Sequence, residues 1–214
     1  MAYRKTPAVH HRLAAAREHL VEQATFVVAE VGWANASVTA VAAAAGISVG
    51  SVYQHFASKG ALAVEVFRRA SGREVEVLSE VLREAAGDPV ERLALGVEVF
   101  ARRAMESRGL AHALLAAPAE PALGRERLLF RRLYREVFAE VIREGIGAGR
   151  LPDQDAEVTA AALTGAIGEV LVDPLSDPAE GGAADQLIDE LVVMSLRCAG
   201  ARPDDRPLRP RGLR

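Results

Sequence analysis

The sequence predicts an all-α protein of about nine helices, because composition and periodicity both favour this class. Of the 214 residues, 50% are hydrophobic but only 5% are aromatic. Alanine and unbranched side chains dominate, and they lose little conformational freedom in a helix. Apolar residues recur at helical spacing along most of the chain, whereas no series of short alternating β-branched runs predicts a sheet.

The first third of the chain predicts four helices separated by short turns. An apolar stripe at helical spacing ends at Gly32, and Gly46 separates two shorter segments. Ser37, Ser48 and Ser58 are expected N-caps, because a serine hydroxyl accepts hydrogen bonds from the free amides of a first helical turn. The expected ranges are 10–31, 38–45, 49–55 and 59–86.

The rest of the chain predicts five more helices. Asp88-Pro89 is a strong helix start, since aspartate caps free amides and proline costs nothing at the first helical position. A linker rich in proline and glycine fills 173–182, and 201–214 is expected to be a disordered tail. The expected helices are one from 89 to 104, one over 110–116, one from 129 that closes at Gly149, and two over 156–172 and 183–199.

Charge and cysteine content restrict the class of protein. The formal net charge is −3, yet residues 1–70 hold seven basic against four acidic residues, a small excess of the sign that DNA binding needs. Cys198 is the single cysteine and cannot form an intrachain disulfide, and no residue cluster has metal-ligand spacing. The N-terminus has no apolar signal core, and no uninterrupted apolar stretch approaches the roughly 20 residues of a membrane span. We therefore expect a cytoplasmic protein with no membrane association, metal or cofactor.

The segment 37–56, SVTAVAAAAGISVGSVYQHF, predicts a helix-turn-helix. Such a motif needs two short helices and a tight turn, and Gly46 can adopt the positive φ that the turn requires. We expect Ile47 to fill the space between the two helices as an apolar plug. Six apolar residues are expected to pack together in this region, namely Val38, Val41, Val52, Leu20, Val27 and Phe56.

The same segment strongly resembles the DNA-binding region of the TetR/AcrR family. The residues that carry the resemblance are Gly32-Trp33, Ser37, Ala42, Ala45-Gly46-Ile47-Ser48, Gly50, Tyr53, His55-Phe56, Lys59 and Leu62. The resemblance implies a helix-turn-helix DNA-binding domain over 1–65 and a helical ligand-binding and dimerisation domain over 66–200. It also implies a homodimeric repressor that binds a palindromic double-stranded DNA operator and is released by a small hydrophobic or amphipathic ligand.

The resemblance also assigns roles to residues of the motif. The expected phosphate contacts are Ser37, Thr39, Tyr53, His55 and Lys59. The expected base-reading residues are Ser48, Val49, Gly50, Ser51 and Gln54. The two short helices lack arginine and lysine, unlike many family members, so extra positive charge would have to come from an N-terminal arm with Arg4, Lys5 and Arg12.

Two groups of residues in the C-terminal region are candidate sites. Apolar cavities with a few polar anchors bind small molecules, and the candidate lining residues are Phe100, Met105, His112, Phe130, Tyr134 and Phe138. Each of them also fits plain core packing. The last two helices place small residues beside large ones, and the expected dimer interface consists of Leu163, Ile167, Val170, Leu171, Leu187, Leu191 and Met194. The alternative for these residues is burial within one chain. Arg102, Arg103, Arg131 and Arg132 are expected on solvated faces, where one could anchor an acidic ligand.

Three other classes of protein make predictions that differ from those of a regulator. Gly46 to Gly50 formally fits the G-x-S-x-G elbow of α/β-hydrolases, with Ser48 as nucleophile, but that elbow follows a strand and the residues before Gly46 favour a helix. An enzyme or carrier built on a helical bundle would show turnover or a bound cofactor. A family member that has lost DNA recognition would act through protein contacts. Binding to DNA upstream of its own gene separates these classes.

Overall fold

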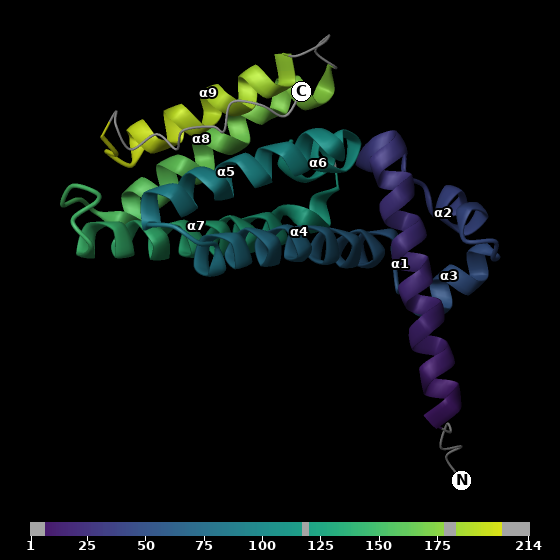
Figure 1. Cartoon of the computed structure of the whole chain (residues 1–214). Helices are drawn as coiled ribbons and strands as arrows, with labels where there is room; N and C mark the ends of the chain where they lie inside the picture. The colour runs from purple at the N-terminus through teal and green to yellow at the C-terminus, as the bar shows by residue number, and fades with distance from the viewer. Residues whose placement is uncertain (1–6, 117–119, 178–182, 203–214) are drawn as a thin grey trace. The chain divides into compact units, whose positions relative to one another are not determined.

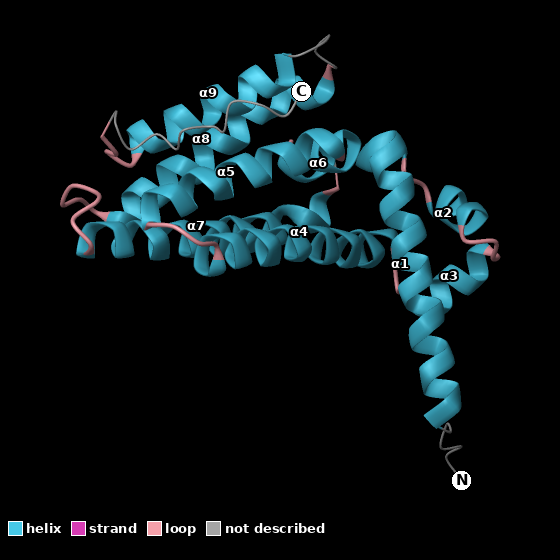
Figure 2. Cartoon of the chain, in the orientation of Figure 1, coloured by secondary structure: helices cyan, strands magenta, loops and turns pink. Residues whose placement is uncertain are grey.

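The computed structural model describes residues 7–116, 120–177 and 183–202, and among them every regular element is helical (Figure 2). The prediction of an all-α fold is therefore confirmed. This part of the chain contains nine α-helices, which Figure 1 labels in order, and one 3₁₀ turn. Their bounds are α1 Pro7–Asn35, α2 Val38–Ala44, α3 Val49–His55, α4 Lys59–Glu84, α5 Pro89–Glu106, α6 Arg108–Leu115, η1 Pro121–Leu123, α7 Gly124–Gly147, α8 Ala156–Ser176 and α9 Ala183–Cys198.

The described residues fall into two compact units, each made of two separate stretches of chain. The N-terminal unit holds the residues up to Ser71 together with Gly109–Arg127. The C-terminal unit holds Gly72–Arg108 together with the residues from Leu128 onward. The sequence predicts consecutive domains over 1–65 and 66–200, whereas α4 and α7 each contribute to both of these units. The predicted tail lies outside the described residues from 203 onward.

The helical geometry of α1 is interrupted at the predicted position. Gly32 has a φ of 69° and a ψ of 171°, so two helical segments meet at a kink there. The predicted break at Gly32 is confirmed, and helical geometry resumes beyond it as far as Asn35. Trp33 directly follows this kink; its indole is buried and donates from Nε1 to the carbonyl oxygen of Ala113 in α6 at 2.7 Å.

Helix α6 lies so close to α1 that a side chain would not fit between them. A Cβ atom on Gly109 would lie 1.9 Å from the carbonyl oxygen of Ala29, a separation that non-bonded atoms do not reach. Glycine is therefore required at 109 by contact with α1. Together with the Trp33 hydrogen bond, this close approach makes α6 part of the N-terminal unit although it is distant in sequence.

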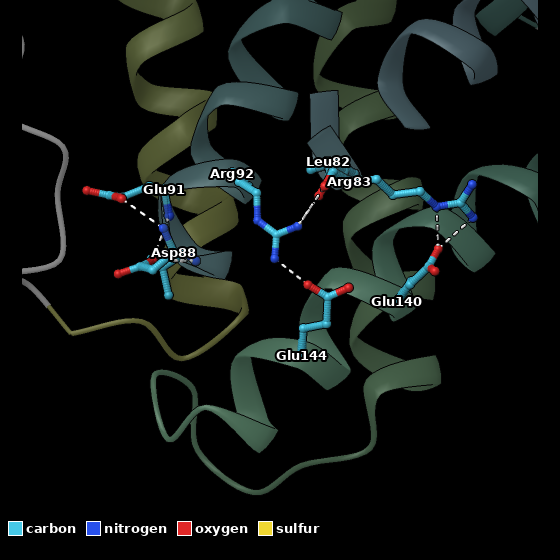
Figure 3. Close-up of polar contacts among 8 residues, drawn as sticks. Leu82, Arg83, Asp88, Glu91, Arg92, Glu140 and Glu144 are labelled. Carbon is cyan, nitrogen blue, oxygen red and sulfur yellow. Dashed lines mark hydrogen bonds and ion pairs between the residues drawn. The ribbon is translucent and has the colours of Figure 1, made fainter. Parts of the chain in front are cut away.

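Arginine side chains connect the helices of the C-terminal unit (Figure 3). Arg92 of α5 donates to the carbonyl oxygen of Leu82 at the end of α4 at 2.7 Å and also pairs with Glu144 of α7. Its side chain is only 11% exposed, so the guanidinium acts as a buried polar connection among three helices. Arg83 and Glu140 join α4 to α7 a short distance away, with a nitrogen-to-oxygen separation of 2.7 Å.

The predicted start of α5 is confirmed. The carboxylate of Asp88 accepts from the amides of Val90 at 2.8 Å and Glu91 at 3.1 Å, while the Glu91 side chain accepts from the Asp88 amide at 2.9 Å (Figure 3). This reciprocal arrangement satisfies amides that the helix itself leaves free. The carboxylate of Asp88 also binds Arg150 at 2.8 Å. Burial raises the pKa of Asp88, but the backbone hydrogen bonds and Arg150 outweigh burial and leave it below the usual value.

Helices α8 and α9 pack against each other, and α9 also packs against α5. The sequence places the end of the first of these helices at 172, but α8 continues through Pro174 to Ser176. Among the described helices, α8 is the one long and apolar enough to cross a membrane by length and composition, with a mean hydropathy of 1.4. Only 28% of that apolar window is buried within the chain.

Candidate nucleic-acid interface

The turn between α2 and α3 is closed by two hydrogen bonds that satisfy the last carbonyl groups of α2. The amide of Ile47 donates to the oxygen of Ala42 at 3.0 Å, and the amide of Gly46 donates to that of Ala43 at 3.1 Å. This pattern needs a residue in the left-handed region between the helices, and Gly46 has a φ of 66°. The predicted positive φ of Gly46 is confirmed, and a helix precedes the turn where a hydrolase elbow would need a strand.

Serine residues cap both short helices as the sequence predicts. The Oγ atom of Ser37 accepts from the amide of Ala40 at 3.0 Å, and that of Ser48 accepts from the amide of Ser51 at 3.1 Å. The hydroxyl groups of Ser48 and Ser51 also lie within hydrogen-bond distance, at 2.9 Å. The start of α3 is therefore fixed by local hydrogen bonds, which determine how its side chains are presented.

Helix α2 packs against α1, and α3 packs against α2. Both helices are buried at a central valine, since Val41 is 3% exposed and Val52 is 1% exposed. Of the other residues expected in this core, Leu20, Val27 and Phe56 are buried and Val38 is half-buried. Ile47 is 38% exposed, so the prediction that it plugs the space between the helices was wrong. The turn directs the Ile47 side chain outward, and the valines fill the interior.

The outer side of α3 is open to solvent over the whole length of the helix. Val49 is 37% exposed and Tyr53 is 51% exposed, and Ser48, Gly50 and Gln54 are exposed as well. Ser51 and His55 are half-buried. Thus four of the five base-reading candidates lie on the exposed surface of one short helix or at its cap, with the fifth partly accessible beside them.

The other residues expected to contact phosphates lie before and after α3 in the sequence. Ser37 and Thr39 are exposed at the start of α2. Lys59, at the first position of α4, donates from Nζ to the carbonyl oxygen of Trp33 at 3.4 Å and is half-buried. An ammonium group has three donors, so this contact leaves two for an anion. Arg12 of the expected N-terminal arm is exposed, whereas Arg4 and Lys5 lie outside the described residues.

The charge distribution around α3 suits a polyanion. Between Glu30 and Glu65 the chain contains no acidic residue. A phosphate backbone approaching α2 and α3 therefore meets no carboxylate from this stretch, and the helix N-termini direct free amides outward. Helices α2 and α3 offer neutral donors and no arginine, so the charged donor described beside them is Lys59 at the start of α4.

Arg17 of α1 contacts both the end of α3 and helix α4. The guanidinium of Arg17 lies 4.7 Å from the ring centroid of Phe56, the residue that ends α3, and pairs with Glu65 of α4 at 2.8 Å. The hydrogen bond from Arg17 lowers the pKa of Glu65 below its usual value. These contacts fix α3 and α4 against one side of α1.

Comparison with known proteins covers both parts of the chain. Residues 20–66 match the family described as bacterial regulatory proteins, tetR family, and residues 86–171 match the tetracyclin repressor-like C-terminal domain. The chain belongs to the TetR family. The resemblance seen in the sequence is thereby confirmed, and it extends beyond the helix-turn-helix to the C-terminal region.

Individual relatives agree with this family assignment. Over 77 residues the chain is 38% identical to the HTH-type transcriptional repressor DhaR of Mycobacterium sp. (strain GP1), a match that covers 36% of this chain and 39% of DhaR. A transcriptional regulator from Rhodococcus sp. Rha1 is 27% identical, with a TM-score of 0.65 over 87% of this chain and 99% of that one. The structure of a SmeT–triclosan complex has a TM-score of 0.74 at 19% identity, covers 94% of this chain and 99% of its own, and shows the shared fold.

The ligand candidates of this TetR family member are divided between the two units. Phe100 and Tyr134 meet edge to face, with ring centroids 5.7 Å apart, in the C-terminal unit. Phe130 and Phe138 are buried there and Met105 is half-buried, whereas His112 belongs to α6 in the N-terminal unit. Burial raises the pKa of the Tyr134 phenol, and the charge of Glu74 raises it further, so the phenol stays protonated as a hydrogen-bond donor.

Four of the seven expected dimer-interface residues lie inside the chain's own core. Leu163, Ile167, Leu171 and Leu191 are at most 2% exposed, so the prediction that they contact a partner was wrong. They pack within the layer formed by α5, α8 and α9. The accessible members of the set are Val170, which is 39% exposed, and the half-buried Leu187 and Met194.

Sequence reasoning missed the residues that hold α6 and α7 to the N-terminal unit. Trp33 is part of the family motif, but its hydrogen bond to Ala113 depends on a segment 80 residues away. Similarly, Arg68 of α4 binds both carboxylate oxygens of Glu126 in the first turn of α7, at 2.7 and 2.8 Å. The tryptophan itself and the glycine at 109 were the available signals in the sequence, and neither identifies its partner.

Proposed function

We propose that this chain is a ligand-responsive transcriptional repressor whose homodimer binds a palindromic DNA operator. The observation that carries the proposal is the exposed, acid-free outer side of α3, held by two capped helices on a buried valine core. A short helix that is presented in this way fits a major groove, and a two-fold dimer presents it twice. The similarity to the DhaR repressor, 38% identity over 77 residues, supports the assignment.

Recognition in this proposal divides between positioning and reading. Tyr53, His55 and Lys59 contact phosphates at the edge of the groove, while Ser37 and Thr39 contact them from α2. Gln54 reads adenine with its amide, and Val49 contacts a thymine methyl group. Arginine is the usual reader of guanine, and these helices have none. The preferred operator should therefore have A·T pairs at the positions that α3 contacts.

The dimer in this proposal forms through the open surface of α8 and α9. Helix α8 is strongly apolar, yet most of its apolar window is not buried within the chain. Val158 is 65% exposed and Val170 is 39% exposed on this helix. Covering such a surface with its symmetry mate removes apolar area from water, which stabilises a dimer.

Release of DNA follows from linkage between two sites. In this proposal a small apolar ligand enters the aromatic region around Phe100 and Tyr134. The ligand binds more tightly to a conformation in which the two α3 helices of the dimer are displaced. Ligand binding therefore weakens operator binding by the same coupling free energy by which operator binding weakens ligand binding, typically about 1–3 kcal/mol. The SmeT–triclosan structure, which shares the fold, supports a ligand of this size and polarity.

The test is binding to duplex DNA from upstream of the chain's own gene, measured by fluorescence anisotropy at several salt concentrations. The wild-type protein should bind this duplex more tightly than a scrambled duplex. The Gln54→Ala variant should lose about 10- to 100-fold of that preference. Gln186→Ala, an exposed glutamine in α9, is the matched control and should keep it. Equal affinity for both duplexes, or salt-independent binding, would refute the proposal.

A further inference from the structure

The C-terminal unit contains an open cleft of about 610 Å³ between α7 and α8. Its walls are Leu128, Arg131, Arg132 and Arg135 of α7 with Ala161 and Thr164 of α8. None of the six residues expected to line an apolar inducer cavity lines this cleft, but Arg131 and Arg132, two of the arginines that could anchor an acidic ligand, do. Half of its lining residues are arginines, all three exposed.

These three arginines have no carboxylate partner among the described residues. Elsewhere in the same unit, arginines of α4 and α5 are paired, as Arg92 is with Glu144 and Arg103 with Glu74. Acidic residues are not scarce, since the chain has 29 of them against 26 basic ones. The cleft therefore brings together three arginines that form no ion pair among the described residues, in a chain that is negative overall.

The spacing of the arginines adds to this effect. Arg131 and Arg135 are four residues apart on one helix and Arg132 is three from Arg135, so their side chains are neighbours on the surface of α7. Like charges at these separations repel one another and destabilise a helix. An anion bound among them removes this repulsion.

The chemistry of the walls defines the class of anion. Guanidinium groups bind phosphate and carboxylate oxygens through paired N–H donors, and three of them favour a doubly charged group. The hydroxyl of Thr164 already donates to the carbonyl oxygen of Ala160 at 2.8 Å, so the arginines supply the donors. Leu128, which is 66% exposed, and Ala161 give the cleft an apolar side.

We propose that this cleft binds an organic phosphate monoester, with the dianionic phosphate among the arginines and the organic group against Leu128 and Ala161. The site is separate from the aromatic region assigned to the inducer. Its occupancy requires neither DNA nor the proposed regulatory function.

The proposal is tested by isothermal titration calorimetry of the full chain in phosphate-free buffer. Phenyl phosphate should bind, inorganic phosphate should bind more weakly, and phenol should give no heat at the same concentration. Arg132→Gln/Arg135→Gln should weaken phenyl phosphate binding by about 10-fold or more, since charge-assisted hydrogen bonds are lost. Arg197→Gln, an exposed arginine of α9 without a described partner, is the control and should leave affinity within about twofold.

Three results would overturn the proposal. One is that wild-type protein does not distinguish phenyl phosphate from phenol, a comparison that needs no folded variant. Another is an equal loss of affinity in Arg197→Gln, which would indicate non-specific charge attraction. The third is a change of oligomeric state in the double variant by sedimentation, which would assign the cleft to the acidic surface of a second copy.

Discussion

At the scale of single residues, we expect ion pairs that are buried between helices to contribute more to stability than ion pairs on open surfaces. Glu126 is 5% exposed and receives two hydrogen bonds from Arg68, so its carboxylate is removed from water only because a guanidinium compensates it. The hydrogen bonds from Arg68 outweigh burial and lower the pKa of Glu126 below its ordinary value of 4.5. The pair connects α4 to the start of α7 inside the N-terminal unit.

Replacing this carboxylate by an amide should destabilise the protein in a pH-dependent way. Glu126→Gln is expected to lower the free energy of unfolding at pH 7 by about 1.5–3 kcal/mol, the range for hydrogen bonds to charged groups. Because the folded-state pKa is lowered, the stabilisation is present above the ordinary value of 4.5 and is lost as the pH falls through the lower folded-state value. Urea unfolding of both proteins at pH 7 and at lower pH measures the difference. Glu30→Gln, at an exposed position on α1, should have little effect at either pH, and a Glu126→Gln difference that stayed constant with pH would contradict this account.

At the scale of elements, the helix-turn-helix depends on a few backbone requirements. Two serine caps, one left-handed glycine and two inward valines determine where α2 and α3 start, turn and rest. All of these requirements act over a few residues, which explains why the sequence motif is recognisable. The same locality makes each requirement separately testable by substitution.

Two glycine-to-alanine substitutions in this motif should have opposite effects on stability. A Cβ on Gly46 meets open space, so Gly46→Ala should be destabilising by about 1–2 kcal/mol from left-handed backbone strain alone. Gly50 has ordinary helical geometry, and its Cβ would lie 3.7 Å from the Oγ of Ser48, so Gly50→Ala should be neutral or stabilising by up to about 1 kcal/mol. Thermal unfolding followed by circular dichroism distinguishes the two. Equal shifts of Tm in the same direction would show that the turn does not depend on the conformation of Gly46.

At the scale of the whole molecule, the apolar surface of α8 is divided between two uses. One side, with Leu163, Ile167 and Leu171, forms the core of the C-terminal unit. Two other apolar residues of this helix, Val158 and Val170, remain exposed in the single chain. A helix that is apolar on nearly all sides is stable in water only when its second side is also covered, and the proposed dimer provides that cover.

A charge on the open side of α8 should therefore separate the subunits without unfolding them. Val170→Glu is expected to shift the protein from dimer to monomer in sedimentation equilibrium, because a carboxylate cannot be buried unpaired in the interface. Operator affinity should fall with it, since one half-site contact is lost. Leu95→Glu, at a residue of α5 with a similar 40% exposure, should remain dimeric. A fully dimeric Val170→Glu would exclude this side of α8 from the interface.

The fold was predictable to a large extent because most of its signals are local. Helical periodicity, the Asp88-Pro89 start and the serine caps each involve residues within one or two turns, and the structure places helices where they indicate. The predictions that were wrong concern direction: Ile47 lies outward, and Leu163 and Leu191 lie inward. Periodicity shows that a helix has an apolar face, but it does not show which neighbour covers that face.

The sequence by itself determined the helical class, the helix-turn-helix and the family, because these follow from interactions between residues close together in the chain. Only the tertiary structure decided that Trp33 binds Ala113, that Arg68 binds Glu126, and that α8 keeps one apolar side open. Each of these depends on the packing of segments far apart in sequence, where a displacement of one helix turn would bring different side chains together.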